Sequence, residues 1–273
     1  MSKKETKKEV ETIRFFHKKQ TVKLLEANGT RVKLFVEPET ISGAPVILGF
    51  PNIGITPVLT CTYLVEDLNL PLIGSIETKN IVPKVIISRV GEPCQPIRIF
   101  GDKRIIVICS ELKVSDQALS ELSSAILLFC TSVKTEVLWC IEGKPVEKVD
   151  VIEREEMQFI TTNEKLSTLL LSKGHKVIQG AVITGVTGAV LSDVATSGVD
   201  VDICCMLSPA SSFYPDAWSS VMVIRLLNTV YTTWQSDTSK LEANATAVEN
   251  KVKFLLSKTV KATTSSPVDS YIF

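Results

Sequence analysis

Motifs that carry chemistry are scarce in this sequence of 273 residues. Its two histidines, His17 and His175, have no partnered Cys, Ser or Asp motif, so we place both at the surface. The chain also lacks a Gly-x-Ser-x-Gly elbow, a His-Glu-x-x-His motif and a phosphate-binding loop. These absences argue against an enzyme, and no residue pattern calls for a metal or an organic cofactor.

An excess of one charge and a long apolar run are also missing. Thirty basic residues balance thirty acidic ones, so no net field attracts nucleic acid or an anionic membrane. No run approaches the ~18–20 apolar residues that span a bilayer. Residues 1–10 lack the apolar core of a signal peptide. We therefore expect a cytoplasmic protein without nucleic-acid or membrane partners.

The seven cysteines do not form a recognisable pattern. Their number is odd, no Cys-x-x-Cys spacing occurs, and several lie inside apolar segments. Buried, reduced thiols are the usual meaning of such cysteines in an intracellular protein. We expect the adjacent pair Cys204 and Cys205 to lie in a core strand.

The composition is that of a folded protein, because 45% of the residues are hydrophobic. We predict a charged extension over residues 1–20, one α/β domain over 21–235, an amphipathic helix over 236–258 and a flexible tail over 259–273. No period of 20–50 residues repeats, so a solenoid is excluded.

The stretch Val46–Ile55 organises the domain. An apolar run is interrupted at Gly49 and Pro51 and resumes at Gly54 as a helix-like segment. This pattern predicts a buried strand, a tight turn and a packed helix. The glycines permit either close packing or the approach of a phosphate to backbone amides. Packing is favoured, because Gly49-(x4)-Gly54 has no Lys-Ser/Thr pair and no third glycine.

Hydrophobic periodicity predicts the other elements. Strands are expected at 32–36, 45–50, 72–76, 85–90, 97–100, 105–109, 136–141, 149–152, 157–161 and 199–207, and helices at 54–68, 115–132, 164–171 and 215–231. A glycine-punctuated turn at 185–188 leads into the segment 189–197. The first strand, helix and strand after residue 45 are expected to form a βαβ unit.

The C-terminal region has a different character. Residues 241–255 carry an apolar stripe of about two heptads, which fits packing on the chain's own domain or against a neighbouring subunit. The following Thr/Ser/Pro-rich tail ends in Tyr271, Ile272 and Phe273. Three large apolar side chains on a flexible tip predict a partner's pocket as their destination.

Several short motifs, taken in order, resemble the proteasome assembly chaperone two family. The resemblance begins at Gly49-Phe50-Pro51-Asn52-Ile53-Gly54 and continues through Tyr63-Leu64, Ile73-Gly74, Gly91-Glu92-Pro93 and Ile105–Glu111. It resumes at Gly180–Leu191, with Gly185 and Gly188, and at Pro215-Asp216-Ala217. It spans residues 44 to 231.

This resemblance implies a three-layer α/β/α sandwich similar to the nucleoside-phosphorylase-like fold, without catalysis. It also implies a homo-oligomer, or a heteromer with a paralogue, that binds the α-subunits of the 20S proteasome core particle. Family tails end in a hydrophobic residue, a tyrosine and any residue. Here Ile272 holds the tyrosine position and Tyr271 precedes it, so the tail docks as a shifted variant or binds weakly.

Two other functions fit the sequence. The glycine turns at 49–54 and 185–188 are compatible with an anion or nucleotide cradle in a small-molecule-binding protein or enzyme. Alternatively, the 238–257 helix assembles subunits of a scaffold that has no proteasome partner.

Overall fold

The computed structural model describes residues 19–79, 85–87, 93–146 and 156–246. Its strands are β1 (Lys23–Ala27), β2 (Thr30–Leu34), β3 (Val46–Gly49), β4 (Leu72–Glu77), β5 (Ile86–Ile87), β6 (Pro93–Cys94), β7 (Ile97–Asp102), β8 (Ile105–Cys109), β9 (Leu138–Val146), β10 (Gln158–Thr161), β11 (Lys176–Val177) and β12 (Ile203–Ser211). Its helices are α1 (Thr56–Asp67), α2 (Leu119–Ser132), α3 (Glu164–Ser172), α4 (Gly185–Ser197) and α5 (Ala217–Val230), with short 3₁₀ turns at Pro38–Ile41, Ile53–Ile55 and Asp116–Ala118.

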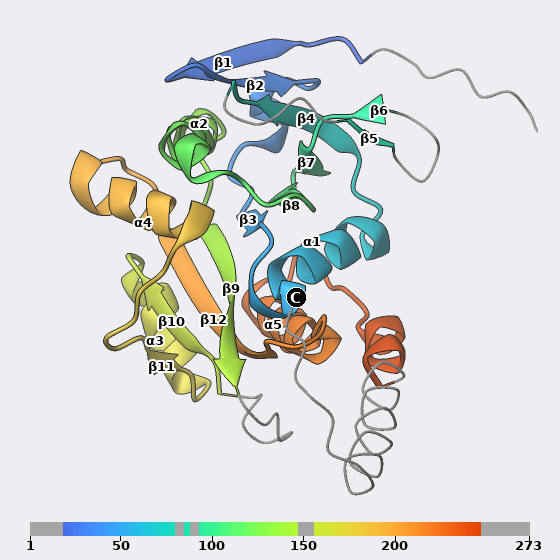
Figure 1. Ribbon diagram of the computed structural model, residues 1–273, viewed down its shortest axis with the longest axis vertical. Coiled ribbons are helices and arrows are strands. Elements are labelled where there is room, and N and C mark those ends of the chain that lie inside the picture. Colours follow the sequence, from blue (N-terminus) through green and yellow to red (C-terminus); the bar gives the residue numbers. More distant parts are fainter. Residues whose placement is uncertain (1–18, 80–84, 88–92, 147–155, 247–273) are drawn as a thin grey trace, which may run out of the picture.

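Ten of these strands form one mixed sheet (Figure 1). Its order is β1-β2-β4-β7-β8-β3-β9-β12-β10-β11. The central strands β8, β3, β9 and β12 are parallel. Antiparallel pairs join β1, β2, β4, β7 and β8 on one side. The prediction of an α/β fold is therefore confirmed.

The expected βαβ unit is interrupted. Strands β3 and β4 flank α1 in the sequence, but β8 and β7 lie between them in the sheet. The cause is the β7–β8 hairpin, which pairs Arg98 with Cys109 and fills the positions next to β3. Sequence order alone does not show that a later hairpin takes the place beside an earlier strand.

Helices pack on both faces of the sheet (Figure 1). Helices α2 and α4 pack against one face, through side chains such as Ile126 of α2 and Val190 of α4. Helices α1 and α5 pack against the other face, through side chains such as Leu64 of α1 and Ile224 of α5. Since apolar side chains alternate between the two clusters along β9 and β12, both faces of the central strands are buried. The expected likeness to nucleoside phosphorylases stays a prediction.

One edge of the sheet was missed by the sequence analysis. Strand β1 pairs antiparallel with β2 through a two-residue turn at Asn28 and Gly29, whose φ angles are 50° and 82°. Positive φ at both turn residues is the geometry that Asn-Gly favours in hairpins. The Asn-Gly pair was the signal for this hairpin.

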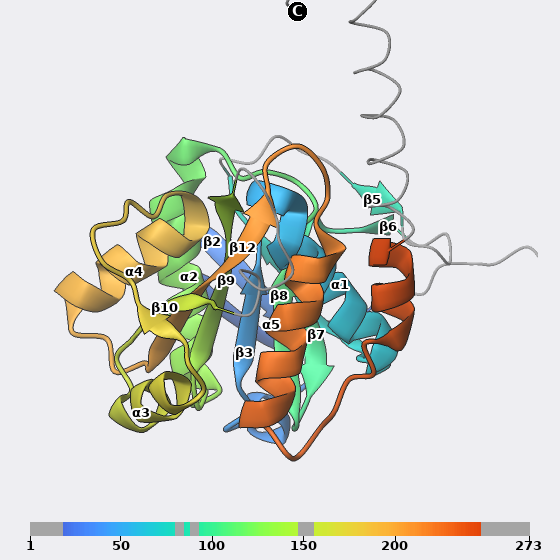
Figure 2. The same cartoon turned by 90° about the horizontal axis from the view of Figure 1, so that it is seen from below.

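The apolar helix α5 is covered by the chain itself. Helix α1 packs against it, and Leu241 and Ala245, in the helical residues 239–246, are buried. Leu241 belongs to the same core cluster as Ile224. Figure 2 shows this last described helix beside α1. The described part of the predicted 236–258 helix therefore packs on its own domain. Its remainder, the 1–18 part of the extension, the predicted strand at 149–152 and the tail lie outside the described residues.

The cysteines are free thiols, and six of the seven are buried; Cys94 is half-buried. The prediction of a surface position for His175 is wrong. This side chain is buried, and burial lowers its pKa. It follows Gly174 at the end of α3, where the His175 N–H donates to the Leu170 carbonyl at 3.1 Å and turns the chain inward.

Candidate functional site

A cavity of about 500 Å³ opens near the carboxyl ends of the parallel strands. Ligands commonly bind at this edge of α/β sheets, because the connecting loops there surround a crevice. Its walls come from the turn after β3, the segment between β8 and α2, the second half of β9 and the start of α4, and include Phe50, Pro51, Asn52, Ile53, Lys113, Val114, Asp116, Leu119, Glu142, Gly143, Lys144, Pro145, Val182, Ile183, Thr184, Gly185, Val186, Thr187 and Leu207.

The two glycine-containing turns singled out in the sequence meet at this cavity. Phe50 to Ile53 form one wall, and Gly185 to Thr187 form another. Gly185 has φ 68° and begins α4, so the predicted turn is the first turn of the helix itself. The N-cap residue Thr184 makes no side-chain cap hydrogen bond. The first backbone N–H groups of a helix lack partners within the helix, which favours an electron-rich neighbour.

Glu142 is the most unusual side chain in the cavity wall. It lies on β9 and is only 8% exposed. Burial raises its pKa to about 7, although a hydrogen bond with the Thr187 side chain acts in the opposite direction. Burial raises the pKa values of the Cys140 and Cys205 thiols, and the nearby Glu142 charge raises them further. The carboxyl group therefore changes charge near neutral pH.

The cavity mouth carries further charges. Lys144 is half-buried, and Lys113 and Asp116 are exposed. Within the described ranges, neither lysine forms an ion pair. The cavity thus combines a buried acid with two cations and an uncapped helix start.

The Phe50–Ile55 turn is fixed by close backbone packing. A Cβ at Gly49 would lie 2.4 Å from the Cys61 sulfur, so only glycine lets α1 approach β3 this closely. A Cβ at Gly143 would lie 2.2 Å from the Ile53 carbonyl oxygen. The sequence pattern did not single out Gly143. Its contact with Ile53 shows that β9 supports the cavity wall directly.

Asp216 ties the same turn to α5. Its backbone N–H donates to the Gly54 carbonyl at 2.7 Å. Its carboxylate accepts from the N–H groups of Ser211 at 2.9 Å and Ser219 at 3.1 Å, and so caps the helix. Asp216 is 1% exposed, which makes this cap part of the core.

The remaining predicted residues are spread more widely. Gly188 lies in α4, where a Cβ would be 2.4 Å from the Ile183 carbonyl oxygen. Gly180 is exposed in the segment before the cavity, and Pro215 is exposed just before the α5 cap. Tyr271, Ile272 and Phe273 lie outside the described residues. The assignment of these glycines, Phe50, Pro51, Pro215 and Asp216 to a family motif stays a prediction.

Large apolar side chains are exposed in loops at the same edge of the sheet. Val182 beside the cavity is 91% exposed, and Phe213 between β12 and α5 is 87% exposed. Ile55 is 41% exposed and has φ 52°, an unfavourable backbone angle for a β-branched residue. Apolar exposure together with strain is more typical of a binding surface than of a structural loop.

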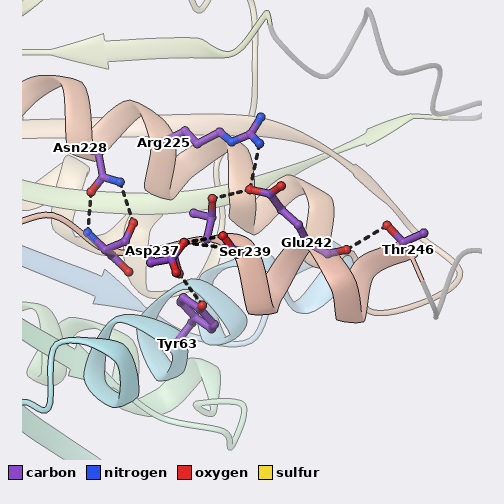
Figure 3. Close-up of polar contacts among 9 residues, drawn as sticks. Tyr63, Arg225, Asn228, Asp237, Ser239, Glu242 and Thr246 are labelled. Carbon is purple, nitrogen blue, oxygen red and sulfur yellow. Dashed lines mark hydrogen bonds and ion pairs between the residues drawn. The ribbon is translucent and has the colours of Figure 1, made fainter.

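A second polar region, here called the clamp, holds residues 236–242 against α1 and α5 (Figure 3). The Tyr63 hydroxyl donates to the Asp237 carbonyl at 2.5 Å. The Asn228 amide exchanges two hydrogen bonds with the Ser236 backbone, at 2.8 and 3.0 Å. Asp67 accepts from the Ser236 hydroxyl at 2.7 Å and from the Asp237 N–H at 3.0 Å.

The clamp ends at the start of the last described helix. Glu242 pairs with Arg225 of α5 at 2.8 Å and accepts a hydrogen bond from Thr238 (Figure 3). These contacts lower the Glu242 pKa, and the hydrogen bond from Thr238 has the largest effect. The clamp therefore fixes the point from which the chain continues beyond residue 246.

In the part of the chain that the structure describes, no helix is both long and apolar enough to cross a membrane. No group of three or more His, Cys, Asp or Glu side chains is placed there to hold a metal ion.

The fold is similar to solved archaeal structures. Pyrococcus furiosus PbaA, described as an archaeal homolog of proteasome-assembly chaperone, has a TM-score of 0.71 and 22% identity, over 85% of this chain and 94% of that one. PbaB of the same organism, described as an archaeal proteasome activator, has a TM-score of 0.69 and 17% identity, over 85% and 99% of the two chains. At such identities, the likeness establishes the fold alone.

The sequence comparisons agree with this fold. An uncharacterized protein of Methanocaldococcus jannaschii is 23% identical over 221 residues, which are 81% of this chain and 89% of the relative. The sequence pattern of the PAC2 family matches residues 46–256, from β3 through the clamp and beyond. Since this match covers most of the chain, the protein belongs to the PAC2 family.

Proposed function

We propose that the protein is a non-enzymatic chaperone or binding factor in proteasome assembly. The observation that carries this proposal is the PAC2 family match over residues 46–256. It is supported by the similarity to PbaA and PbaB, which are described as a homolog of proteasome-assembly chaperone and as a proteasome activator. The partner is a proteasome α-subunit or the 20S core particle.

The proposed contact involves the C-terminal tail. Tyr271, Ile272 and Phe273 enter a partner pocket on the α-ring, because their apolar surface is costly to leave in water. The clamp supports this mechanism, since it anchors residues 236–242 to α1 and α5 through side chains such as Asp67 and Tyr63. A fixed point of departure limits the volume that the tail explores, which raises its effective concentration near a docked partner.

The protein acts as an oligomer in this proposal, either with itself or with a paralogue, and in the cytoplasm. Repeated tails on a symmetric oligomer would bind a ring of α-subunits far more tightly than one tail does, since each later contact becomes intramolecular.

Co-sedimentation with cognate core particles and with free α-subunits tests the proposal. We would compare the wild type, a chain ending at Ser270, and the full-length double variant Tyr271→Ala/Phe273→Ala. The matched control is Thr263→Ala/Thr264→Ala, which alters the tail without touching its tip. We expect the control to bind like the wild type. The chain ending at Ser270 and the Tyr271→Ala/Phe273→Ala variant should both lose binding.

Other outcomes are equally informative. Binding that survives truncation at Ser270 would move the contact to the folded body and remove the tail from the proposal. If neither the core particle nor the α-subunits bind the wild type, the proteasome role itself is wrong.

A further inference from the structure

The cavity contains charged groups that the proposed proteasome role does not use. Glu142 and Lys144 are two residues apart on β9 and both line the cavity. Alternate residues of a strand share a face and lie about 7 Å apart along it. Within the described part of the chain, Glu142 and Lys144 do not pair with each other. An acidic and a basic side chain therefore line the same cavity, and the strand fixes the distance between their backbone positions.

Glu142 retains capacity to accept hydrogen bonds. A carboxylate offers about four acceptor positions. Its described side-chain partner is Thr187, and the carboxyl group is only 8% exposed to water. A buried carboxylate with few donors is unfavourable unless a cation reaches it. An ammonium group in the cavity would supply both the charge and the missing donors.

The part of the cavity beside Glu142 also has groups that suit an anion. Lys113 and Lys144 supply cations, and Val186 and Thr187 lie in the first turn of α4. That helix has 13 residues and its N-cap Thr184 makes no side-chain cap hydrogen bond. Backbone N–H groups at such a helix start favour a carboxylate or phosphate.

Other parts of the cavity wall are apolar. Phe50, Ile183 and Leu207 line the cavity, and Val182 at its mouth is 91% exposed. The volume of about 500 Å³ lies within the range of ~300–1,000 Å³ that is typical of small-molecule sites.

We propose that this cavity binds a small zwitterion with an apolar side chain, an amino acid or dipeptide of the leucine type. Its ammonium group lies at Glu142, its carboxylate at Lys144 and the first turn of α4, and its side chain against Phe50 and Ile183. This site is independent of the C-terminal tail, so either proposal can fail without the other.

Ammonium binding requires the charged form of Glu142, which makes the affinity depend on pH. The groups that face this carboxyl are Thr187 of α4, the thiols of Cys140 and Cys205, and the cavity residues Lys113, Lys144 and Asp116. With a pKa of about 7 in the empty site, affinity falls by up to about tenfold for each pH unit below 7.

Isothermal titration calorimetry with four small probes tests the proposal. L-leucine and leucyl-leucine carry both charges, 4-methylpentanoate lacks the ammonium group, and isopentylamine lacks the carboxylate. At pH 8 and ligand concentrations up to about 10 mM, we expect at least one of the two zwitterions to bind and both single-charge analogues to bind at least about tenfold more weakly.

Three variants locate the site. Glu142→Gln and Lys144→Met should each weaken zwitterion binding by at least about tenfold, and Glu142→Gln should also remove the pH dependence. Glu136→Gln is the matched control, because Glu136 lies just before the opposite end of the same strand. Circular dichroism would verify that each variant is folded.

Three results would overturn the inference. If 4-methylpentanoate binds as tightly as the zwitterions, the cavity is a plain anion cradle. The inference also fails if both Glu142→Gln and Lys144→Met leave zwitterion binding unchanged, or if neither zwitterion gives any heat of binding.

Discussion

The clamp and the cavity both depend on carboxylates, yet they satisfy them to very different degrees. In the clamp, Glu242 has two partners, Arg225 and Thr238, and these contacts lower its pKa. In the cavity, Glu142 has a side-chain hydrogen bond with Thr187, and burial raises its pKa to about 7. The same residue type is stabilised as an anion in one region and destabilised in the other.

The difference separates two uses of a polar residue. A carboxylate with several donors holds segments of the chain together, and its loss leaves those donors without partners. A carboxyl group beside a hollow with few donors contributes little to holding the fold, and instead keeps acceptor capacity for another molecule. Removal of the carboxylate charge should therefore raise the stability of the folded protein at the cavity and lower it at the clamp.

The largest expected effect is the one that Glu142 has on how the stability of the fold depends on pH. Its pKa is about 7 in the folded protein and 4.5 in a free side chain, so the folded state binds more protons between these values. Stability therefore falls as pH rises through 4.5 to 7 and levels off above, by up to about 3 kcal/mol. Glu142→Gln lacks this loss and should be more stable than the wild type at pH 8.

Urea unfolding at pH 5, 6.5 and 8 measures this effect. Glu136→Gln keeps the cavity carboxyl and should retain most of the slope. A Glu142→Gln variant that is less stable than the wild type at pH 8 would show that the Glu142 anion holds the fold, and the contrast with the clamp would disappear.

The next largest effect is expected for Asp67→Ala in the clamp. This change leaves the buried Ser236 hydroxyl and the Asp237 N–H without their acceptor, which should cost about 2 kcal/mol of unfolding free energy. Hydrogen exchange over residues 236–246 should become faster. Asp67→Asn keeps one acceptor oxygen and should cost about half as much. Unchanged exchange in Asp67→Ala would mean that the clamp does not hold this segment.

A smaller effect is expected for Arg225→Ala. The Arg225 side chain is 48% exposed, and exposed ion pairs contribute no more than about 1 kcal/mol. Chemical denaturation should give a loss below this value, and added salt should reduce the difference. Arg225→Lys serves as the charge-conserving control. A loss above about 2 kcal/mol would make this pair, rather than Asp67, the main anchor of the clamp.

The smallest effect is expected for Phe213→Ser on the cavity side. Because this side chain is 87% exposed, its removal should change the unfolding free energy by no more than about 0.5 kcal/mol. Phe159→Ala, at a position that is 1% exposed, should cost about 3–5 kcal/mol in the same assay. A large loss for Phe213→Ser would show that the loop after β12 is structural.

Much of the fold followed from the sequence, because long amphipathic and apolar segments predict their own structure. The helix at 164–171 is an example, and in the structure Asn163 caps it by accepting from the Leu166 N–H at 2.9 Å. The order of strands did not follow. Nothing local to 46–77 indicates that β7 and β8 separate β3 from β4.

The candidate site was predicted only in part. The turns at 49–54 and 185–188 were recognised by their glycines, but Glu142, just after the strand predicted at 136–141, was not identified as a site residue. Its setting depends on Thr187, a residue that a distant part of the chain places beside it. Burial and partner geometry are properties of the fold, so a lone carboxylate in a strand gives no sequence signal for them.

The position of Leu241 in the core has a consequence for the order of events during synthesis. The cluster that contains Leu64 of α1 and Ile224 of α5 also contains Leu241, and the Tyr63 hydroxyl bonds to the Asp237 carbonyl. A growing chain that has not yet reached residue 241 has made α1 without part of its cover. This face of the protein therefore closes late, and until then a nascent chain exposes apolar surface that other proteins in the cell can contact.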